Sequence, residues 1–139
     1  MTSVQQDRAT EQVSVALAYV QGKRRVERVL EAATALVERY AAVSEPTARL
    51  ALAVELIRRN LSPEVSLSFA GHEFGVEVPA TTGDALYELC LIRREDGAVG
   101  VFRARYTEHN PLLLTPGEWR SALRLLVGVA VTAAGGYVG

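Results

Sequence analysis

The chain has 139 residues, of which 49% are hydrophobic and 22% are charged, a balance typical of a folded domain and not of a disordered segment. With 15 Lys and Arg residues against 16 Asp and Glu residues, the net charge of -1 excludes a global electrostatic attraction to nucleic acid or to an anionic membrane. The single cysteine excludes an internal disulfide and any metal site built from several cysteines.

The first part of the chain carries the apolar spacing of helices. Apolar side chains recur every three or four positions in residues 26–40 and again in residues 46–60, which places them on one face of each helix. A shorter stripe precedes Gly22 and consists of Val13, Leu17 and Val20. A break at Gly22 and a single bent helix both remain open. The pattern predicts a helical hairpin or a three-helix unit over residues 1–62.

The next part of the chain changes to the apolar period of strands. Residues 65–78 alternate between apolar and polar side chains and predict two half-buried strands joined by a tight turn at Gly71. Residues 85–94 are apolar on both alternating faces, as expected of a strand in the middle of a sheet. Asp96 and Gly97 then favour a type I′ hairpin, because both tolerate positive φ. We expect an antiparallel sheet of about four strands.

The last element is a helix with a clear start. Thr115 is a candidate N-cap, Pro116 suits the first helical position, and Glu118 stands three residues after Thr115, which completes a capping box. The helix that follows is apolar nearly all round as far as Val131, so the sheet alone would not cover it. Because the uncharged segment 125–138 is shorter than the roughly 20 residues needed to cross a bilayer, we expect a buried or dimer-forming helix.

These elements predict one α+β domain over residues 1–139, with a helical part at 1–62 and a sheet plus C-terminal helix at 63–139. Cys90 lies in the most hydrophobic predicted strand, so we expect it in the core. The sequence contains no helical histidine pair, no Gly-rich phosphate loop and no nucleophile elbow. We therefore assign no catalytic residue, no metal and no cofactor, and we lean against an enzyme.

Two features favour a protein interaction. The C-terminal helix has more apolar surface than a sheet can cover, and the predicted hairpin carries arginines, whose planar fork binds carboxylates in a bidentate way. We expect a cytoplasmic homodimer with a further protein partner, and no membrane partner, since the N-terminal residues lack the order of a secretory signal. The candidate contact residues are Trp119, Leu125, Val129, Val131, Arg93, Arg103 and Arg105.

Two alternatives remain open. The first is a small-ligand protein or a small α+β enzyme with an apolar pocket, whose polar groups would be Tyr87, Glu88, His72 and Tyr106. The second is a DNA-binding regulator with a helix-turn-helix in residues 40–60. In that segment only three side chains could reach phosphate, namely Arg49, Arg58 and Arg59.

The second half of the chain also carries a family pattern. It consists of a cysteine that opens an apolar strand, a glycine turn, a Val-x-Val strand, a proline, a short apolar run and Thr-Pro-x-Glu-Trp at the start of a helix. The matching residues are Cys90, Gly97, Val99, Val101, Pro111, Leu112, Leu114, Thr115, Pro116, Glu118 and Trp119. Over about a quarter of its length, residues 90–127, the chain resembles the actinobacterial family of domain of unknown function 397. Its members are typically encoded beside XRE-type helix-turn-helix regulators, so the resemblance implies a regulatory protein that binds such a regulator.

Overall fold

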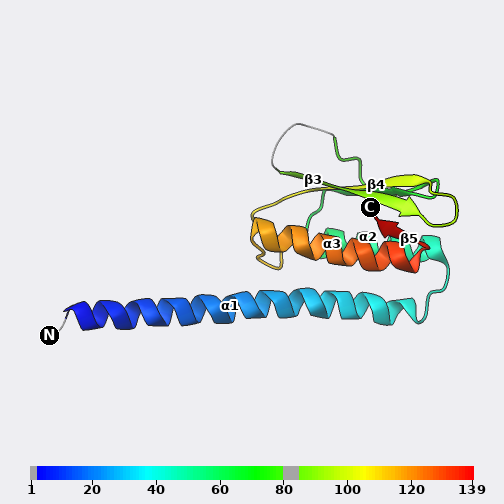
Figure 1. Cartoon of the computed structure of the whole chain (residues 1–139). Coiled ribbons are helices and arrows are strands. Elements are labelled where there is room, and N and C mark those ends of the chain that lie inside the picture. The colour runs from blue at the N-terminus through cyan, green and yellow to red at the C-terminus, as the bar shows by residue number, and fades with distance from the viewer. Residues whose placement is uncertain (1–2, 80–84) are drawn as a thin grey trace.

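The computed structural model describes residues 3–79 and 85–139 of the chain. Figure 1 shows a long helix at the bottom, two shorter helices above it and a sheet at the top. In chain order the elements are α1 (Ser3–Tyr40), α2 (Pro46–Asn60), β1 (Val65–Phe69), β2 (His72–Gly75), β3 (Leu86–Arg93), β4 (Val99–Arg105), α3 (Pro116–Ala133) and β5 (Gly136–Val138). The predicted α+β class is therefore confirmed.

The sheet contains five antiparallel strands in the order β2-β1-β4-β3-β5. The prediction of about four strands lacks β5, which follows α3 and pairs with β3 through Leu91↔Val138 and Ile92↔Tyr137. β5 has only three residues, one of them a glycine, and it continues the uncharged segment of the C-terminal helix. Neither alternation nor length therefore marks it as a strand in the sequence.

Both predicted hairpins are present, and glycines make their turns possible. β1 and β2 pair around Gly71, whose φ is 81°. β3 and β4 are joined through Gly97, whose φ is 72°, but the bond from Arg93 N–H to the Ala98 carbonyl closes a longer loop. Asp96 does not adopt the positive φ that the first central residue of a type I′ turn needs. The hairpin prediction is thus confirmed and its turn type is wrong.

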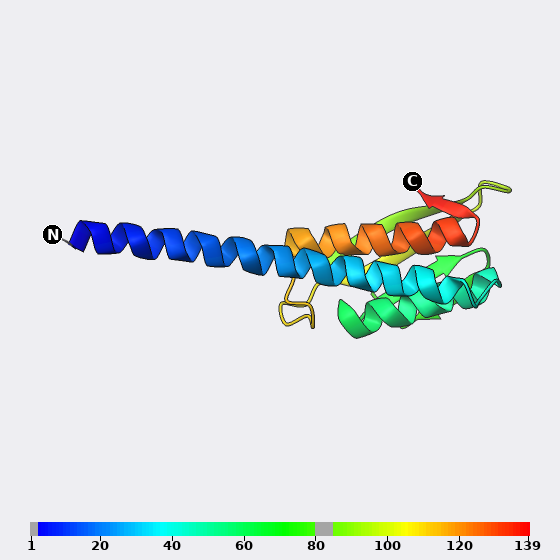
Figure 2. The same cartoon turned by 90° about the horizontal axis from the view of Figure 1, so that it is seen from below.

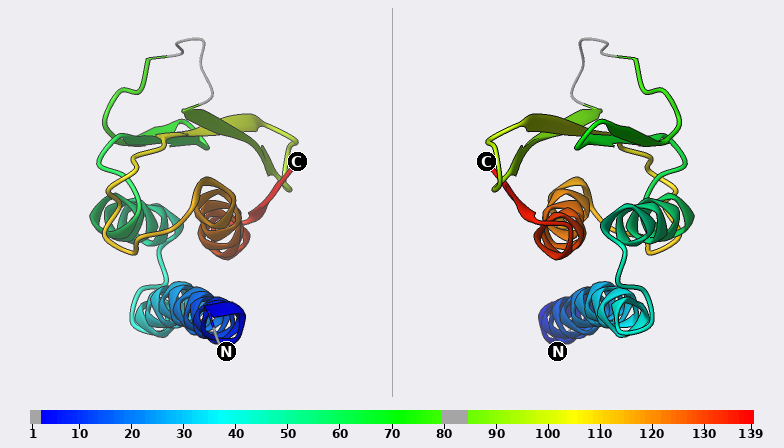
Figure 3. Two further views of the ribbon diagram at one scale, coloured as in Figure 1. Left: turned by 90° about the vertical axis from the view of Figure 1, so that its left-hand side faces the viewer. Right: turned by 90° about the vertical axis from the view of Figure 1, so that its right-hand side faces the viewer.

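The helices cover one face of the sheet. Figure 3 shows α2 and α3 side by side beneath the sheet and α1 below this pair. Alternate residues of β1, namely Val65, Leu67 and Phe69, point toward the helices and are buried. The opposite face carries no helix in the part of the chain that the structure describes, and we call it the open face. The core therefore lies between the sheet and the α2–α3 pair.

Cys90 lies on the open face and is exposed, so its predicted place in the core is wrong. Its neighbours Leu89 and Leu91 point to the helices and are buried. All three side chains are apolar, and a run of this kind does not show which face of a strand is covered. β3 is buried on one face, not on both as predicted.

α1 runs without interruption from Ser3 to Tyr40, so the break considered at Gly22 is absent. Residues 3–62 contain two helices, α1 and α2, and form a helical hairpin, not a three-helix unit. At 1.5 Å per residue, the 38 residues of α1 span about 57 Å. Figure 2 shows that the N-terminal half of α1 extends well beyond the sheet and the other helices.

α3 begins at the predicted capping box. The Thr115 hydroxyl accepts from the Glu118 N–H, and the Glu118 carboxylate accepts from the Thr115 N–H at 3.0 Å. One turn later, the Trp119 indole N–H donates to the Leu61 carbonyl at 3.0 Å. Because α3 lies between the sheet, α2 and α1, the chain itself covers most of its apolar surface. The buried residues of α3 are Trp119, Ala122, Leu123, Leu126, Val127, Ala130 and Val131.

Candidate protein interaction surface

α1 divides into two parts at Arg25. The Arg25 Nε–H donates to a carboxylate oxygen of Glu118 at 2.8 Å, which ties the helix to the start of α3. Residues 25–40, which we call the root, pack against α3 and α2. Residues 7–24, which we call the arm, extend past the start of α3. Figures 1 and 2 show no other helix or strand of the described chain beside the arm.

Buried side chains and hydrogen bonds hold the root in place. Leu36 is 0% exposed, and Tyr40 is buried with its hydroxyl donating to the Arg49 carbonyl at 3.0 Å. Burial raises the pKa of Tyr40 to about 12, against the opposing effect of the Arg49 charge. The Arg49 guanidinium in turn donates to the backbone carbonyls of Tyr40 and Ala133, at the ends of α1 and α3, and to that of Val43 between α1 and α2.

Glu118 links the cap of α3 to the root of α1. Its partial burial raises its pKa, but hydrogen bonds from the Thr115 backbone N–H and from Arg25 outweigh that effect. The pKa of Glu118 therefore lies below its usual value, and the carboxylate is ionised at neutral pH. One side chain thus caps α3 and positions α1 where the arm leaves the fold.

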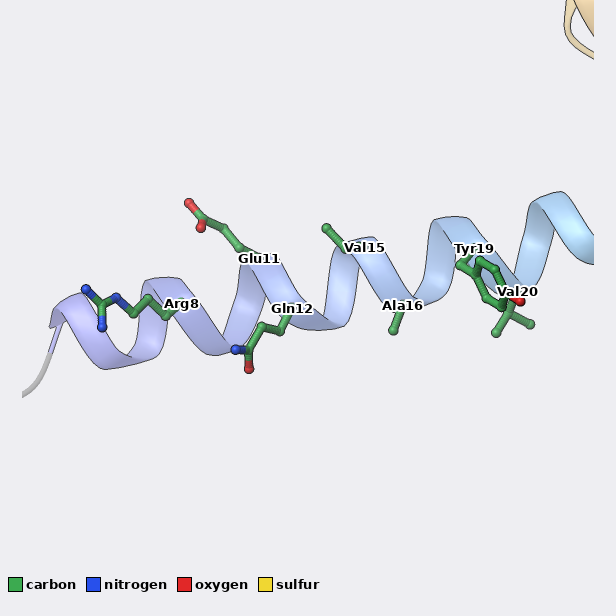
Figure 4. Close-up of a pocket in the computed structure, with 7 residues that line it drawn as sticks. All are labelled: Arg8, Glu11, Gln12, Val15, Ala16, Tyr19 and Val20. Atoms are coloured by element: carbon green, nitrogen blue, oxygen red, sulfur yellow. The ribbon is translucent and has the colours of Figure 1, made fainter.

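The arm exposes large apolar side chains. All described side chains in residues 7–20 are exposed, and Val15 and Tyr19 are exposed by 70% and 73%. Figure 4 shows this part of α1, with the labelled side chains projecting from the helix into open space. Large apolar side chains that gather on a protein surface mark contact with another molecule. Three further large apolar residues of the arm are exposed on the opposite side of the helix, namely Val13, Leu17 and Val20.

The root exposes apolar side chains too, on the side where it meets α3. Val26, Leu30 and Val37 are exposed, and Leu125 of α3 is 40% exposed beside them. Two shallow grooves lie between the helices. The first is lined by Val26, Val29, Leu30, Leu114, Gly117, Glu118, Ser121, Ala122 and Leu125, and the second by Val37, Tyr40, Arg124, Leu125, Gly128, Val129, Thr132 and Ala133.

Five of these exposed residues form one line along the helix. At 100° per residue they fall within about 60° of one another around the helix axis. The line crosses the boundary between arm and root without interruption, and we call it the α1 stripe. Its members are Val15, Tyr19, Val26, Leu30 and Val37. The apolar stripe predicted for the start of the chain ran through Val13 and Leu17 and did not include Tyr19 and Val15. Continuing the helical spacing of residues 26–40 toward the N-terminus would have identified both residues.

The structure separates the contact residues predicted on α3. Trp119 is 1% exposed and Val131 is buried, so a partner has no access to them in the folded chain. Leu125 is exposed and Val129 is partly buried, and both line the second groove. Two of the four candidates on this helix therefore belong to the core and two to the surface beside α1.

The three predicted contact arginines lie elsewhere and are paired with carboxylates. Arg93 binds Asp96 within the hairpin loop, and this hydrogen bond raises the pKa of Arg93 and lowers that of Asp96 below its usual range. The other two project from the open face, where Arg103 lies 3.6 Å from Glu88 and Arg105 lies 3.2 Å from a carboxylate oxygen of Glu64. They do not form one surface with the α1 stripe.

The four polar groups proposed for a ligand pocket are not brought together. Tyr87 and Tyr106 pack edge-on against Trp119, with ring centroids 6.1 and 5.2 Å away, on the core side of the sheet. Glu88 is exposed on the open face, and His72 is exposed on the edge strand β2. A hollow on the open face has a mainly polar lining, which is not the apolar character of most ligand pockets.

The geometry of the described residues gives little support to a metal site, a membrane-spanning helix or a DNA-binding surface. Within residues 3–79 and 85–139, no group of three or more His, Cys, Asp and Glu side chains could hold a metal ion. Among the described helices, none combines the length and the apolar character that a membrane crossing needs. Of the arginines considered for DNA, Arg49 is used inside the fold and Arg59 pairs with Glu55, while Arg58 is exposed.

Comparisons with known proteins give no relative from which to transfer a function. No protein-family model, no curated protein and no solved structure matches the chain.

Proposed function

We propose that the protein is a non-catalytic interaction protein of the cytoplasm and that its main binding element is α1. The principal support is the arm, a helical segment with exposed apolar side chains and no neighbouring element in the described chain. An isolated helix of this length is marginally stable in water, so the arm gains order when a partner covers it. Burying four or five such side chains would contribute on the order of 5 to 10 kcal/mol.

We include a helix-turn-helix regulator among the candidate partners, because residues 90–127 resemble a family whose members are encoded beside such regulators. That segment forms β3, β4 and the first part of α3. A regulator recognised in this way would bind the open face, where Arg103 and Arg105 project, and the arm would remain available for a second contact.

The proposal is tested by placing charges on the α1 stripe. In the double variant Val15→Glu and Tyr19→Glu, two carboxylates replace the most exposed apolar side chains of the arm. The matched control is Ser14→Glu with Gln21→Glu, which adds the same charge to the same helix on a face away from the stripe. Tagged versions are used for affinity capture from the native cell, and the captured polypeptides are quantified.

We expect the control to retain the wild-type set of captured proteins and the stripe variant to lose it. Both variants should keep the near-UV circular dichroism of Trp119, which is buried in the core and not on the arm. Equal capture by the two variants, or no capture by the wild type of any protein including a second copy of the chain, would contradict the proposal.

A further inference from the structure

We infer that the arm binds a second copy of this chain, with the two α1 helices antiparallel, so that the arm of each subunit lies against the root of the other. This inference rests on the proposed function and names the partner of the same surface. It follows from the spacing of the α1 stripe, from Gly22, from the area of the stripe and from the charges beside it.

Four of the five residues of the α1 stripe are symmetric about the point between Gly22 and Lys23, and the fifth, Val37, would lie level with Arg8. Tyr19 lies 3 residues before Gly22 and Val26 lies 3 residues after Lys23. Val15 lies 7 residues before Gly22 and Leu30 lies 7 residues after Lys23. A two-fold axis at this point pairs Tyr19 with Val26 of the second copy and Val15 with Leu30, each contact occurring twice, as an isologous interface requires.

Gly22 stands where the two helices would cross. A glycine inside a helix costs about 1 kcal/mol relative to alanine. No steric contact within the chain requires it, because a Cβ at this position would meet only the end of the flexible Arg25 side chain, at 3.5 Å. Close approach of a second helix backbone at the two-fold axis would explain why a glycine, which has no side chain, stands at this position.

The second copy also has the surface that the arm needs. From the level of Arg8 to Val37 the paired region is about 44 Å long at 1.5 Å per residue and about 10 Å wide. Treated as a flat strip, the contact area is about 440 Å² per subunit and about 900 Å² in total. The side chains make the true surface larger than this strip. The groove walls that α3 adds, with Leu125 and Val129, bring this near the 1,000 Å² from which specific interfaces begin.

Charges at the end of the arm fit the same pairing. Glu11 would lie level with residue 34 of the second copy, beside the groove that Arg124 lines. Arg8 would lie level with Val37, near the C-terminal end of α3, whose last turn contains no basic residue. A cation at that end is favourable, since the carbonyls of a helix C-terminus carry partial negative charge.

The pairing is tested by disulfide cross-linking of the full chain. Cys90 is exposed, so it is first replaced by Ser to remove the natural thiol. Tyr19→Cys and Val26→Cys are then combined in one chain. They cannot bridge within it, because seven residues of helix separate them by about 10.5 Å, beyond the reach of a disulfide. Oxidation with diamide should give a covalent dimer of twice 15.0 kDa.

Two control variants make the result specific. Tyr19→Cys alone should not cross-link in the antiparallel pair, where the two copies of that position are about 10.5 Å apart, but it would cross-link in a parallel pair. Ser14→Cys with Glu31→Cys is at the same level along the helices but faces away from the stripe, so we expect no covalent dimer. Sedimentation equilibrium of the unmodified chain should give twice the 15.0 kDa of one subunit.

Each result decides the inference. A covalent dimer from the paired cysteines alone supports the antiparallel stripe. Cross-linking of the single Tyr19→Cys variant, or a dimer by sedimentation without cross-linking of the paired cysteines, overturns it. A monomer at 100 µM also overturns it, and if that monomer still captures another protein through the stripe, the proposed function remains.

Discussion

The arm and the root belong to one helix and have the same apolar spacing, but their surroundings differ. In the root, Leu36 and Tyr40 are buried against the rest of the fold. In the arm, Val13, Leu17 and Val20 also have helical spacing, but they are exposed by 66%, 55% and 43%. Apolar periodicity therefore indicates that a helix has a face to be covered, and it does not say whether the cover comes from the same chain.

The largest expected difference between the two parts comes from one substitution made in each. Leu36→Ala removes a fully buried side chain and should lower the free energy of unfolding by about 3 kcal/mol. Leu17→Ala removes an exposed side chain outside the α1 stripe and should change it by less than about 0.5 kcal/mol. Urea denaturation followed by Trp119 fluorescence measures both. Equal losses would mean that the arm is packed in solution.

Gly22→Ala should separate the stability of the helix from its association. The helix gains up to about 1 kcal/mol from the better helix former, and the chain has room for the added methyl group. The same methyl group would keep the paired helices apart, so self-association should weaken while the helix content rises. Circular dichroism and sedimentation equilibrium give the two readings, and stronger association of the alanine variant would speak against a close crossing at this residue.

Acid should loosen the boundary between arm and root by a smaller amount. The pKa of Glu118 is lowered in the folded chain, so its contribution to stability is present above the pKa of the unfolded state and is lost as the pH falls through the folded value. Because the pair with Arg25 is partly exposed, we expect less than about 1 kcal/mol. The melting temperatures of wild type and Glu118→Gln should differ at pH 7 and converge toward pH 3. A constant difference would exclude ionisation as its cause.

The smallest predicted effect concerns the salt dependence of association. Lys23 lies next to the proposed two-fold axis and would approach its own copy in the dimer. Screening of this repulsion should strengthen association about twofold between 50 mM and 500 mM NaCl. Lys23→Gln should reduce the dependence on salt, and a dimer that weakens with salt in both proteins would argue for a different register.

Local signals in the sequence predicted the elements whose ends are set by local chemistry. The capping box at Thr115 and Glu118 and the turn at Gly71 are of this kind, because their hydrogen bonds and dihedral angles involve neighbouring residues. The exposure of Cys90 and the pairing of β5 depend on which face of the sheet the helices cover and on which edge remains open. These are long-range properties that period and composition do not contain.

The candidate site was only partly predictable for the same reason. The sequence shows that Val26, Leu30 and Val37 have helical spacing, but not that the root turns Leu36 inward and leaves those three outside. Trp119 was predicted as a contact residue because its helix is apolar all round, yet the end of α2 accepts its indole hydrogen bond and the fold encloses it. The sequence shows how many apolar residues these helices have, but it does not show which of them lie in the core and which lie on the surface.

A single arginine, Arg49, connects the end of the long helix α1 to the end of α3. The rigid planar head group of Arg49 bonds to the chain where α1 ends and where α3 ends, which a lysine with its one ammonium group could not reproduce. A tilt of the long helix would therefore displace the end of α3 and, directly after it, β5 at the margin of the sheet. Arg49 therefore couples the position of the long helix to that of the short terminal strand.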